Sequence, residues 1–147
     1  MITVDEIMSV NVQTLNQKNN LPDAKQLMEN QGIHHVPVID DAGAVVGLVS
    51  HRDVLRASGS SLGGDGVEQD PAEIVIKEFM TPNVTTVDGR ASLREAALFL
   101  QKHQYGCLPV VTDGQLKGII TDSDFVAIAI DLLEQAEQAE NTDLDDF

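Results

Sequence analysis

The sequence predicts an α/β (α+β) fold in which two similar β-α-β-β-α units pack on each other with approximate two-fold symmetry. Segments with the helical spacing of apolar residues alternate along the chain with short apolar segments typical of strands. The same series of segments occurs twice within the 147 residues. A unit of about 55 residues buries too little surface to be stable alone, so the two are expected to form one body. Because only 3% of the residues are aromatic and tryptophan is absent, the core must be aliphatic.

The internal repeat covers most of the chain. The segment "IMSVNVQTL" (7–15) aligns with "FMTPNVTTV" (79–87) at an offset of 72 residues, and the same offset aligns "VPV" with "LPV" further on. One residue is then missing from the second copy. At the new offset of 71, "GLVSHRD" (47–53) aligns with "GIITDSD" (118–124). The register is too long to arise from composition, so the elements of one copy predict those of the other.

The first copy is expected to contain five elements after a leader helix at "TVDE". Asn20 suits the N-cap of the next helix, Pro22 suits its first turn, and Gly32 suits its end. The segments "HVPVID" and "VVGLV" predict two strands, and the Asp and Gly residues between them predict a hairpin turn. The expected elements are a strand at about 12–14, a helix at about 21–31, the hairpin strands over 35–40 and 45–49, and a helix from about Ser50.

The second copy repeats this order. Ser92 and Glu95 have the spacing of a capping box at the start of a helix. A long amphipathic pattern closes the chain, and part of its apolar stripe is expected to meet another subunit. The expected elements are a strand near 84–87, a helix over 92–103, strands over 107–111 and 116–120, and a helix from 122 to about 139.

The boundaries of these units follow from composition. The segment "ASGSSLGGDGVEQD" is rich in Gly and Ser and predicts a mobile linker. At its end Asp70 suits a helix cap, Pro71 the first turn, and Glu73 a capping box. The expected organisation is a first repeat with its leader over 1–58, a flexible linker over 59–70, a second repeat with its leader over 71–139, and a fraying acidic tail over 140–147.

Composition excludes several classes of function. The formal net charge of −15 argues against nucleic-acid binding, which needs clustered cations. No run of 18 apolar residues is present, so membrane insertion is not expected. The lone Cys107 cannot form an internal disulfide, and no secretory signal is recognisable, so a cytoplasmic location is expected. No nucleophile–base set, metal cluster or P-loop is recognisable, so an enzyme is not expected.

The repeated unit resembles a CBS domain, and the pair resembles a tandem CBS pair, also called a Bateman module. The resemblance rests on "IMSVNVQTL", "GIHHVPVID" and "GAVVGLVSHRDVL" in the first copy, and on "FMTPNVTTV" and "YGCLPVVTDGQLKGIITDSDFV" in the second. It implies a stand-alone regulatory or sensor module that binds AMP, ADP, ATP or S-adenosylmethionine between the repeats, with no metal required. It also implies a homodimer and a separate protein partner that responds to occupancy.

The pattern Ser/Thr-x-x-Asp at the start of the last helix of each copy has two interpretations. Taken alone, it is a helix capping pattern. The family resemblance assigns Ser50 and Asp53, and likewise Thr121 and Asp124, to ribose subsites. A carboxylate can accept hydrogen bonds from both ribose hydroxyls, and a helix start favours anions. The glycine at the start of each pattern is expected to let a ligand approach the backbone.

Three side chains of the first copy are candidates for binding phosphate. Arg52 is always charged and forms paired hydrogen bonds with phosphate. His34 and His35 lie where the family often places basic groups, but as neighbours on a strand they point to opposite faces and are poor co-ligands for a metal. The second copy has no cation at the matching positions. The cations of the first copy therefore serve either their own pocket or a shared region across the pseudo-two-fold axis.

An adenine ring needs an apolar slot and backbone hydrogen bonds. The resemblance places these functions on the segment around the proline of "VPV" and "LPV" and on the first strand of each copy. The candidates are Ser9, Thr14, Ile33, Val36, Thr81, Thr86, Tyr105, Gly106 and Leu108. The alternative to a sensor is a structural dimerisation module with a vestigial pocket, which the neutral second copy and the net charge favour.

Overall fold

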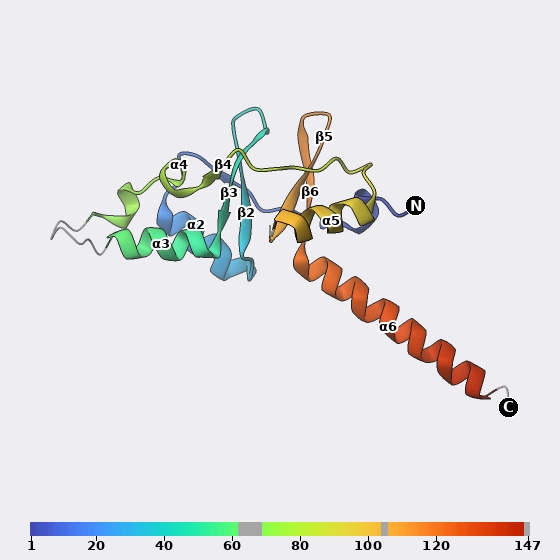
Figure 1. Cartoon of the computed structure of the whole chain (residues 1–147). Coiled ribbons are helices and arrows are strands. Elements are labelled where there is room, and N and C mark those ends of the chain that lie inside the picture. The colour runs from blue at the N-terminus through green and yellow to red at the C-terminus, as the bar shows by residue number, and fades with distance from the viewer. Residues whose placement is uncertain (62–68, 104–105, 146–147) are drawn as a thin grey trace.

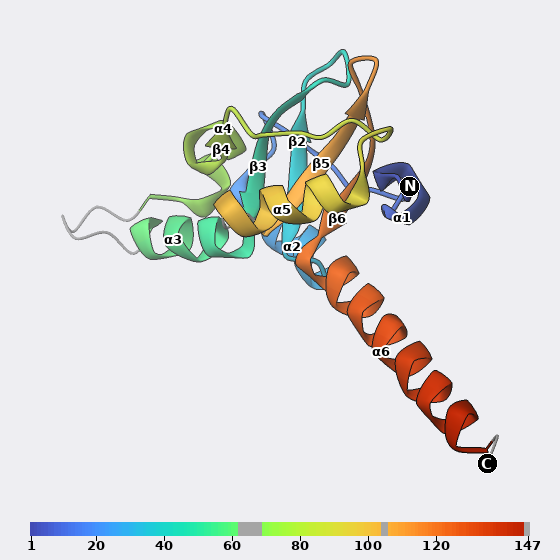
Figure 2. The ribbon, with the colours of Figure 1, turned by 45° about the vertical axis from the view of Figure 1, so that its right-hand side comes forward.

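The computed structural model describes residues 1–61, 69–103 and 106–145 (Figure 1). Two units, each a small sheet with helices beside it, lie next to each other, and the last helix projects away from both (Figures 1 and 2). The elements in chain order are α1 (Val4–Ile7), β1 (Leu15–Asn16), α2 (Leu21–Gln31), β2 (His35–Ile39), β3 (Val45–Ser50), α3 (His51–Ser61), the 3-10 turn η1 (Pro71–Glu73), α4 (Ile76–Phe79), β4 (Thr81–Pro82), α5 (Leu93–His103), β5 (Cys107–Thr112), β6 (Gln115–Thr121) and α6 (Asp122–Asp145).

The first unit is a four-stranded sheet in the order β1-β2-β3-β4, covered by α2 and α3. Helix α2 begins at the predicted cap, where the Asp23 N–H donates to Asn20 Oδ1 (3.0 Å), and it ends at Gly32 in the left-handed conformation (φ 61°). The hairpin of β2 and β3 forms as predicted. The first strand lies at 15–16 rather than 12–14, because Leu15 is the residue that pairs with Val38 of β2 and enters the core.

The second unit is built on the hairpin of β5 and β6, with α5 beside it. Its two-residue turn places Asp113 (φ 53°) and Gly114 (φ 77°) in the left-handed region that tight hairpins require. The strand predicted near 84–87 does not form as an extended strand. Within this segment only Val87 pairs with β5. Its N–H donates to the Pro109 carbonyl (3.0 Å), and its carbonyl accepts from the Val111 N–H (2.8 Å).

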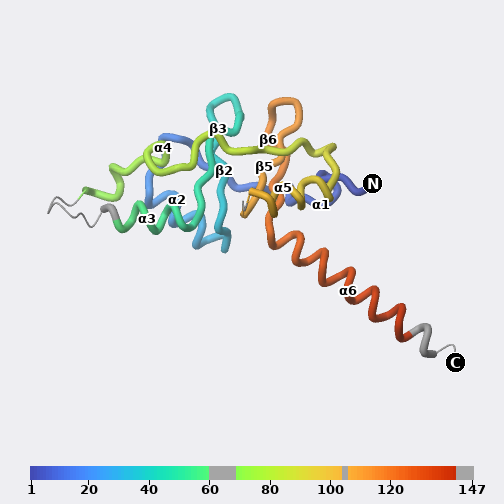
Figure 3. Tube along the Cα trace, in the orientation of Figure 1, coloured from blue at the N-terminus to red at the C-terminus, as the bar shows by residue number. Residues whose placement is uncertain are grey.

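The leader of each repeat packs on the other repeat. The Val4 N–H donates to the Ala91 carbonyl (2.9 Å), and Val4 is buried in the core of the second unit. In the symmetric arrangement the Ile76 N–H donates to the Asn19 carbonyl (2.7 Å), and Ile76 is buried in the core of the first unit. The sequence groups each leader with its own repeat, but the fold exchanges them. The tube in Figure 3 follows both crossings.

The exchanged leaders explain Gly47 and Gly118. A Cβ on Gly47 would lie 2.5 Å from Met80 Sδ, and a Cβ on Gly118 would lie 2.6 Å from Met8 Sδ. The backbone of each leader is also close, because the carbonyl oxygen of Thr81 would lie 3.0 Å from the added Cβ of Gly47, and that of Ser9 would lie 2.7 Å from the added Cβ of Gly118. The prediction that these glycines admit a ligand is therefore wrong, since a leader of the other repeat occupies that space.

The predicted ends and linker differ in part from the structure. Helix α6 continues to Asp145, so residues up to 145 are helical instead of fraying after about 139. Helix α3 extends through Ser61 into the segment predicted as linker, and the middle of that segment (62–68) lies outside the described residues. The leader at 70–73 forms a 3-10 turn in which Asp70 accepts from the Ala72 N–H (3.0 Å), without the predicted capping box. Within the described residues, no helix is long and apolar enough to cross a membrane.

Candidate functional site

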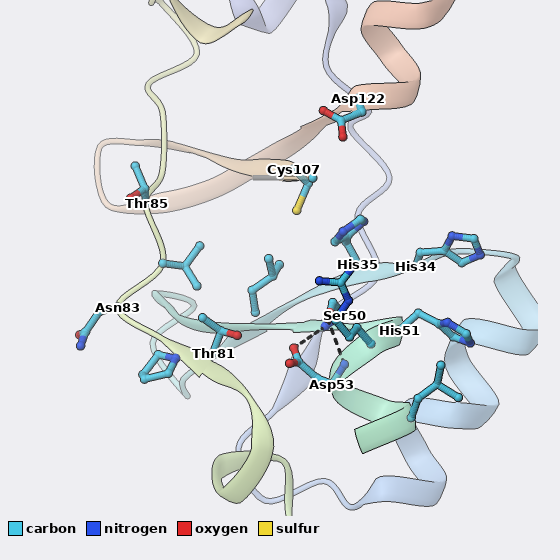
Figure 4. A pocket seen from close by; sticks show the side chains of 16 residues that line it. His34, His35, Ser50, His51, Asp53, Thr81, Asn83, Thr85, Cys107 and Asp122 are labelled. Atoms are coloured by element: carbon cyan, nitrogen blue, oxygen red, sulfur yellow. Dashed lines mark hydrogen bonds between the residues drawn. The ribbon is translucent and has the colours of Figure 1, made fainter. Parts of the chain in front are cut away.

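A pocket of about 780 Å³ lies where the two units meet (Figure 4). The strands β2 and β3 and the start of α3 form one side. The segment at 81–85, which crosses from the second repeat, forms another, and β5 with the first residue of α6 completes the pocket. The lining residues are His34, His35, Leu48, Ser50, His51, Arg52, Asp53, Leu55, Thr81, Pro82, Asn83, Val84, Thr85, Gly106, Cys107 and Asp122.

Ser50 and Asp53 lie in the pocket and also cap α3. The Ser50 N–H donates to Asp53 Oδ2 (2.9 Å), and the Asp53 N–H donates to Ser50 Oγ (3.1 Å). The capping interpretation is therefore confirmed for the first copy. Asp53 is 5% exposed, and its other oxygen, Oδ1, accepts a hydrogen bond from the Arg56 guanidinium. A ligand that uses this carboxylate must share it with Arg56 or displace that side chain.

Arg56 was not identified from the sequence. It lies one helical turn after Asp53, and pairs at this spacing on a helix commonly interact. Charge spacing was therefore a signal that could have revealed it. Although Asp53 is buried, the Arg56 side chain remains 68% exposed.

The corresponding pair in the second copy shares the first of these hydrogen bonds but lies elsewhere. The Thr121 N–H donates to Asp124 Oδ2 (2.8 Å), and the Thr121 hydroxyl lies 3.3 Å from the same oxygen. This is also a capping arrangement, at the start of α6. Neither residue lines the pocket that contains Asp53.

The predicted phosphate-binding side chains gather at one end of the pocket. His34, His35 and Arg52 all line it, and His51 of α3 joins them, with its ring centroid 5.4 Å from that of His34. His51 directly precedes Arg52 and was not singled out from the sequence. This end of the pocket therefore carries four side chains that are cationic or can become so.

Asp122 adds a carboxylate to the same pocket (Figure 4). Burial and the neighbouring His34 lower the pKa of the His35 imidazole, while the carboxylates of Asp122 and Asp53 oppose that shift. The basic side chains of the first copy thus line a pocket to which the second copy contributes an acid. The two repeats make unequal contributions to a shared site.

The Cys107 thiol lines the pocket but is not activated. It is 2% exposed, and burial together with the nearby Asp122 raises the pKa of the thiol to about 12. A nucleophilic cysteine needs the opposite shift. Among the described residues, no group of three or more His, Cys, Asp or Glu side chains is placed to hold a metal ion.

The predicted adenine-binding residues separate into two groups. Thr81 and Gly106 line the pocket, next to Thr85 and Asn83, which the sequence did not single out. The side chains of Val36 and Leu108 are 0% and 1% exposed and belong to the cores of the two units.

The other candidates for the adenine subsite do not line this pocket. The backbone of Ser9 pairs with Ile119 of β6, and Ile33 packs against the core of the first unit. Thr14 and Thr86 are absent from the lining. Tyr105 lies outside the described residues.

Comparison with known proteins gives a consistent result for the repeated unit. A family model for the CBS domain matches the chain twice, over residues 4–60 and 76–131. The two matches follow the two repeats found by internal alignment, and together they cover more than half of the chain.

Solved structures share the fold. A Vibrio cholerae protein, described provisionally as the acetoin utilization protein AcuB, is 47% identical and has a TM-score of 0.83, with 93% of this chain and 98% of that chain covered. CBSX2, solved in complex with AMP, is 30% identical and has a TM-score of 0.76, with 90% of this chain and 98% of that chain covered.

Several curated relatives are longer than this chain. A homoserine O-acetyltransferase of Methanocorpusculum labreanum is 34% identical over 121 residues, which are 82% of this chain and 23% of that enzyme. The chain spans less than half the length of each of the first four curated relatives.

Proposed function

Because the chain belongs to the CBS domain family, we propose that it is a regulatory module that binds an adenosine-containing ligand between its two repeats and transmits occupancy to a separate protein partner. The observation that carries this proposal is the composite pocket. It combines the Ser50–Asp53 pair, hydroxyl groups from the crossing segment, and a cluster of basic side chains, with contributions from both repeats.

The arrangement of these groups supports a ligand with a sugar and a phosphate. Asp53 is the one buried carboxylate among the pocket-lining residues and is suited to vicinal hydroxyls. Arg52 and the histidines supply the charge that favours an anion. Thr81 and Thr85 provide hydroxyl groups on the opposite side of the pocket, where they are available to hydrogen-bond a base or sugar (Figure 4).

Among the candidates AMP, ADP, ATP and S-adenosylmethionine, the basic cluster favours a phosphorylated one. CBSX2, which is 30% identical, was solved in complex with AMP. AMP is therefore the first ligand to test. The resemblance to the Vibrio cholerae protein makes acetoin utilization the first process in which to seek the partner.

A second candidate function is a structural dimerisation module with a vestigial pocket. One observation favours it: both oxygens of Asp53 already accept hydrogen bonds, from the Ser50 N–H and from Arg56. A carboxylate satisfied in this way has less to gain from a ribose. The two candidates differ in whether any adenosine compound binds.

Isothermal titration calorimetry with AMP, ATP, S-adenosylmethionine and adenosine tests the proposal. We expect Asp53→Asn to lower AMP affinity by at least tenfold. Asp124→Asn is the matched control, since it alters the same capping pattern in a helix whose Asp does not line the pocket. No heat from any compound with the wild type would instead support the dimerisation module, whereas equal losses in the two variants would contradict the role assigned to Asp53 in this pocket.

A further inference from the structure

His35 lies at the contact between the two repeats. It is half-buried at the start of β2 and faces the pocket. A Cβ on Gly106 of the second repeat would lie 2.7 Å from His35 Nε2 and 3.0 Å from Cε1. The edge of the imidazole thus occupies the space that a side chain at position 106 would take. Residue 106 is the internal-repeat equivalent of His34, so the missing side chain of one copy makes room for a ring of the other.

Gly106 also connects this contact to the root of α6. Its carbonyl accepts a hydrogen bond from the Asp122 N–H (3.1 Å), which is the first N–H of the helix. The side chain of Asp122 enters the same pocket. A change at His35 therefore reaches the start of α6 by two routes, through contact with Gly106 and through the charge of Asp122.

The groups around His35 set its charge. Burial acts against protonation, and so does His34, which directly precedes β2. From α6 and α3 the carboxylates of Asp122 and Asp53 favour protonation. Arg52 and His51 of α3 and the neutral thiol of Cys107 complete the lining nearby. A phosphate placed beside Arg52 would add a further negative charge to this balance.

We propose that His35 couples ligand binding to the root of α6 by taking up a proton when a phosphate-bearing ligand enters the pocket. This rests on the proposed function. The imidazolium is then attracted to Asp122 across the contact with Gly106, and the angle at which α6 leaves the body depends on occupancy. Neutral adenosine lacks the charge that drives the step.

The direction of the pH dependence follows from linkage. In the free protein the pKa of His35 is lowered, so the ring is mostly neutral at pH 7. A bound anion favours the protonated ring, so protons and ligand bind together. The His35 contribution to affinity is largest below the pKa of the free protein and disappears above that of the complex. Each unit by which the ligand raises this pKa changes affinity up to about tenfold across that interval.

Calorimetry at pH 7 in two buffers of different ionisation enthalpy measures the protons taken up on AMP binding. The expected uptake is a substantial fraction of one proton for the wild type, close to none for His35→Gln, and unchanged for His103→Gln, which alters a histidine on α5 that does not line the pocket. Adenosine should bind without this uptake. Uptake that persists in His35→Gln, or AMP binding without uptake in the wild type, would overturn the inference while leaving the proposed function intact.

Histidine ring resonances followed by NMR on the wild-type protein give a second measurement that does not depend on a variant. The His35 pKa should rise when AMP is added, and resonances at the start of α6 should move with the same titration curve. An unchanged His35 pKa in the AMP complex would reject the coupling. If no adenosine compound binds at all, both the coupling and the proposed function are rejected.

Discussion

At the scale of single residues, positions 47 and 118 require glycine because a segment of the other repeat packs directly against each of them. Each strand has a glycine where the other repeat's leader presses a methionine sulfur and a backbone carbonyl against it. A methionine side chain can move aside, but the leader backbone is held by hydrogen bonds such as Ser9 N–H to the Ile119 carbonyl (3.0 Å). The space that a side chain would need is therefore filled by a part that moves little.

Substituting these glycines should destabilise the fold. We expect Gly118→Ala to lower the free energy of unfolding by about 1–3 kcal/mol, the range typical of overpacking. Urea denaturation followed by circular dichroism measures it. Gly59→Ala is the control, because nothing lies within 4 Å of an added Cβ there and the position is inside α3, where alanine should stabilise by about 1 kcal/mol. An unchanged urea midpoint for Gly118→Ala would contradict this prediction and would mean that the leader moves to accommodate the added methyl group.

Cys107 should be protected from thiol reagents in the folded protein. With a pKa of about 12, only about one thiol in ten thousand is ionised at pH 8, against about a quarter for an ordinary cysteine. Labelling with a chromogenic disulfide should be slow in buffer and fast in urea. Because the folded pKa is the higher one, the Cys107 contribution to stability is complete below the unfolded pKa and decreases as pH rises toward about 12. Labelling at equal rates in both conditions would contradict the burial.

At the scale of elements, the helices and hairpins were predictable because their signals are local. The cap at Asn20 and the left-handed Gly32 bound α2 where the sequence placed it, and the Glu95 N–H donates to Ser92 Oγ (3.3 Å) as predicted for α5. The hairpin turn at Asp113 and Gly114 is equally local.

The exchanged leaders were not predictable in this way. Four-residue helices such as α1 carry no signal for which apolar surface covers them, and both repeats offer similar surfaces. The exchange of the leaders also determines which residues line the pocket. It carries the segment at 81–85 into the pocket of Asp53.

A pair of leader substitutions tests the exchange directly. Val4→Ala should loosen the second unit, and Ile76→Ala should loosen the first, because each side chain is fully buried in the opposite core. We expect Ile76→Ala to lower the free energy of unfolding by about 2–5 kcal/mol, and Val4→Ala to lower it by less, because valine loses fewer carbon atoms. Amide hydrogen exchange should accelerate most in β5 and β6 for Val4→Ala and in β2 and β3 for Ile76→Ala. The reverse pattern would show that each leader serves its own repeat.

At the scale of the whole molecule, α6 projects away from both units (Figures 1 and 2). Its residues beyond Ala129 are exposed in the part of the helix with described side chains, which ends at 141. Large apolar side chains are among them, with Ile130 at 52%, Leu132 at 59% and Leu133 at 64% exposure. An apolar surface of this kind is typical of an interface. This surface of α6 is the candidate interface of the homodimer, which stays a prediction.

Two copies of a chain with net charge −15 repel each other, so the predicted dimer should depend on salt. We expect size-exclusion chromatography with light scattering to show a larger dimer fraction at 0.5 M than at 0.05 M NaCl. Leu133→Asp should shift the protein to monomer. Leu98→Asp on α5, where the side chain is 47% exposed, is the control and should leave the dimer intact. A dimer that survives Leu133→Asp would place the interface elsewhere.

The geometry of α6 makes it a lever arm. Its 24 residues extend about 36 Å at 1.5 Å per residue, and its first residue lines the pocket between the two repeats. A rotation of about 5° at the base would therefore move the far end by about 3 Å, as much as a whole hydrogen-bond length. A displacement too small to detect beside the ligand becomes, at the tip, large enough to make or break contact with another protein.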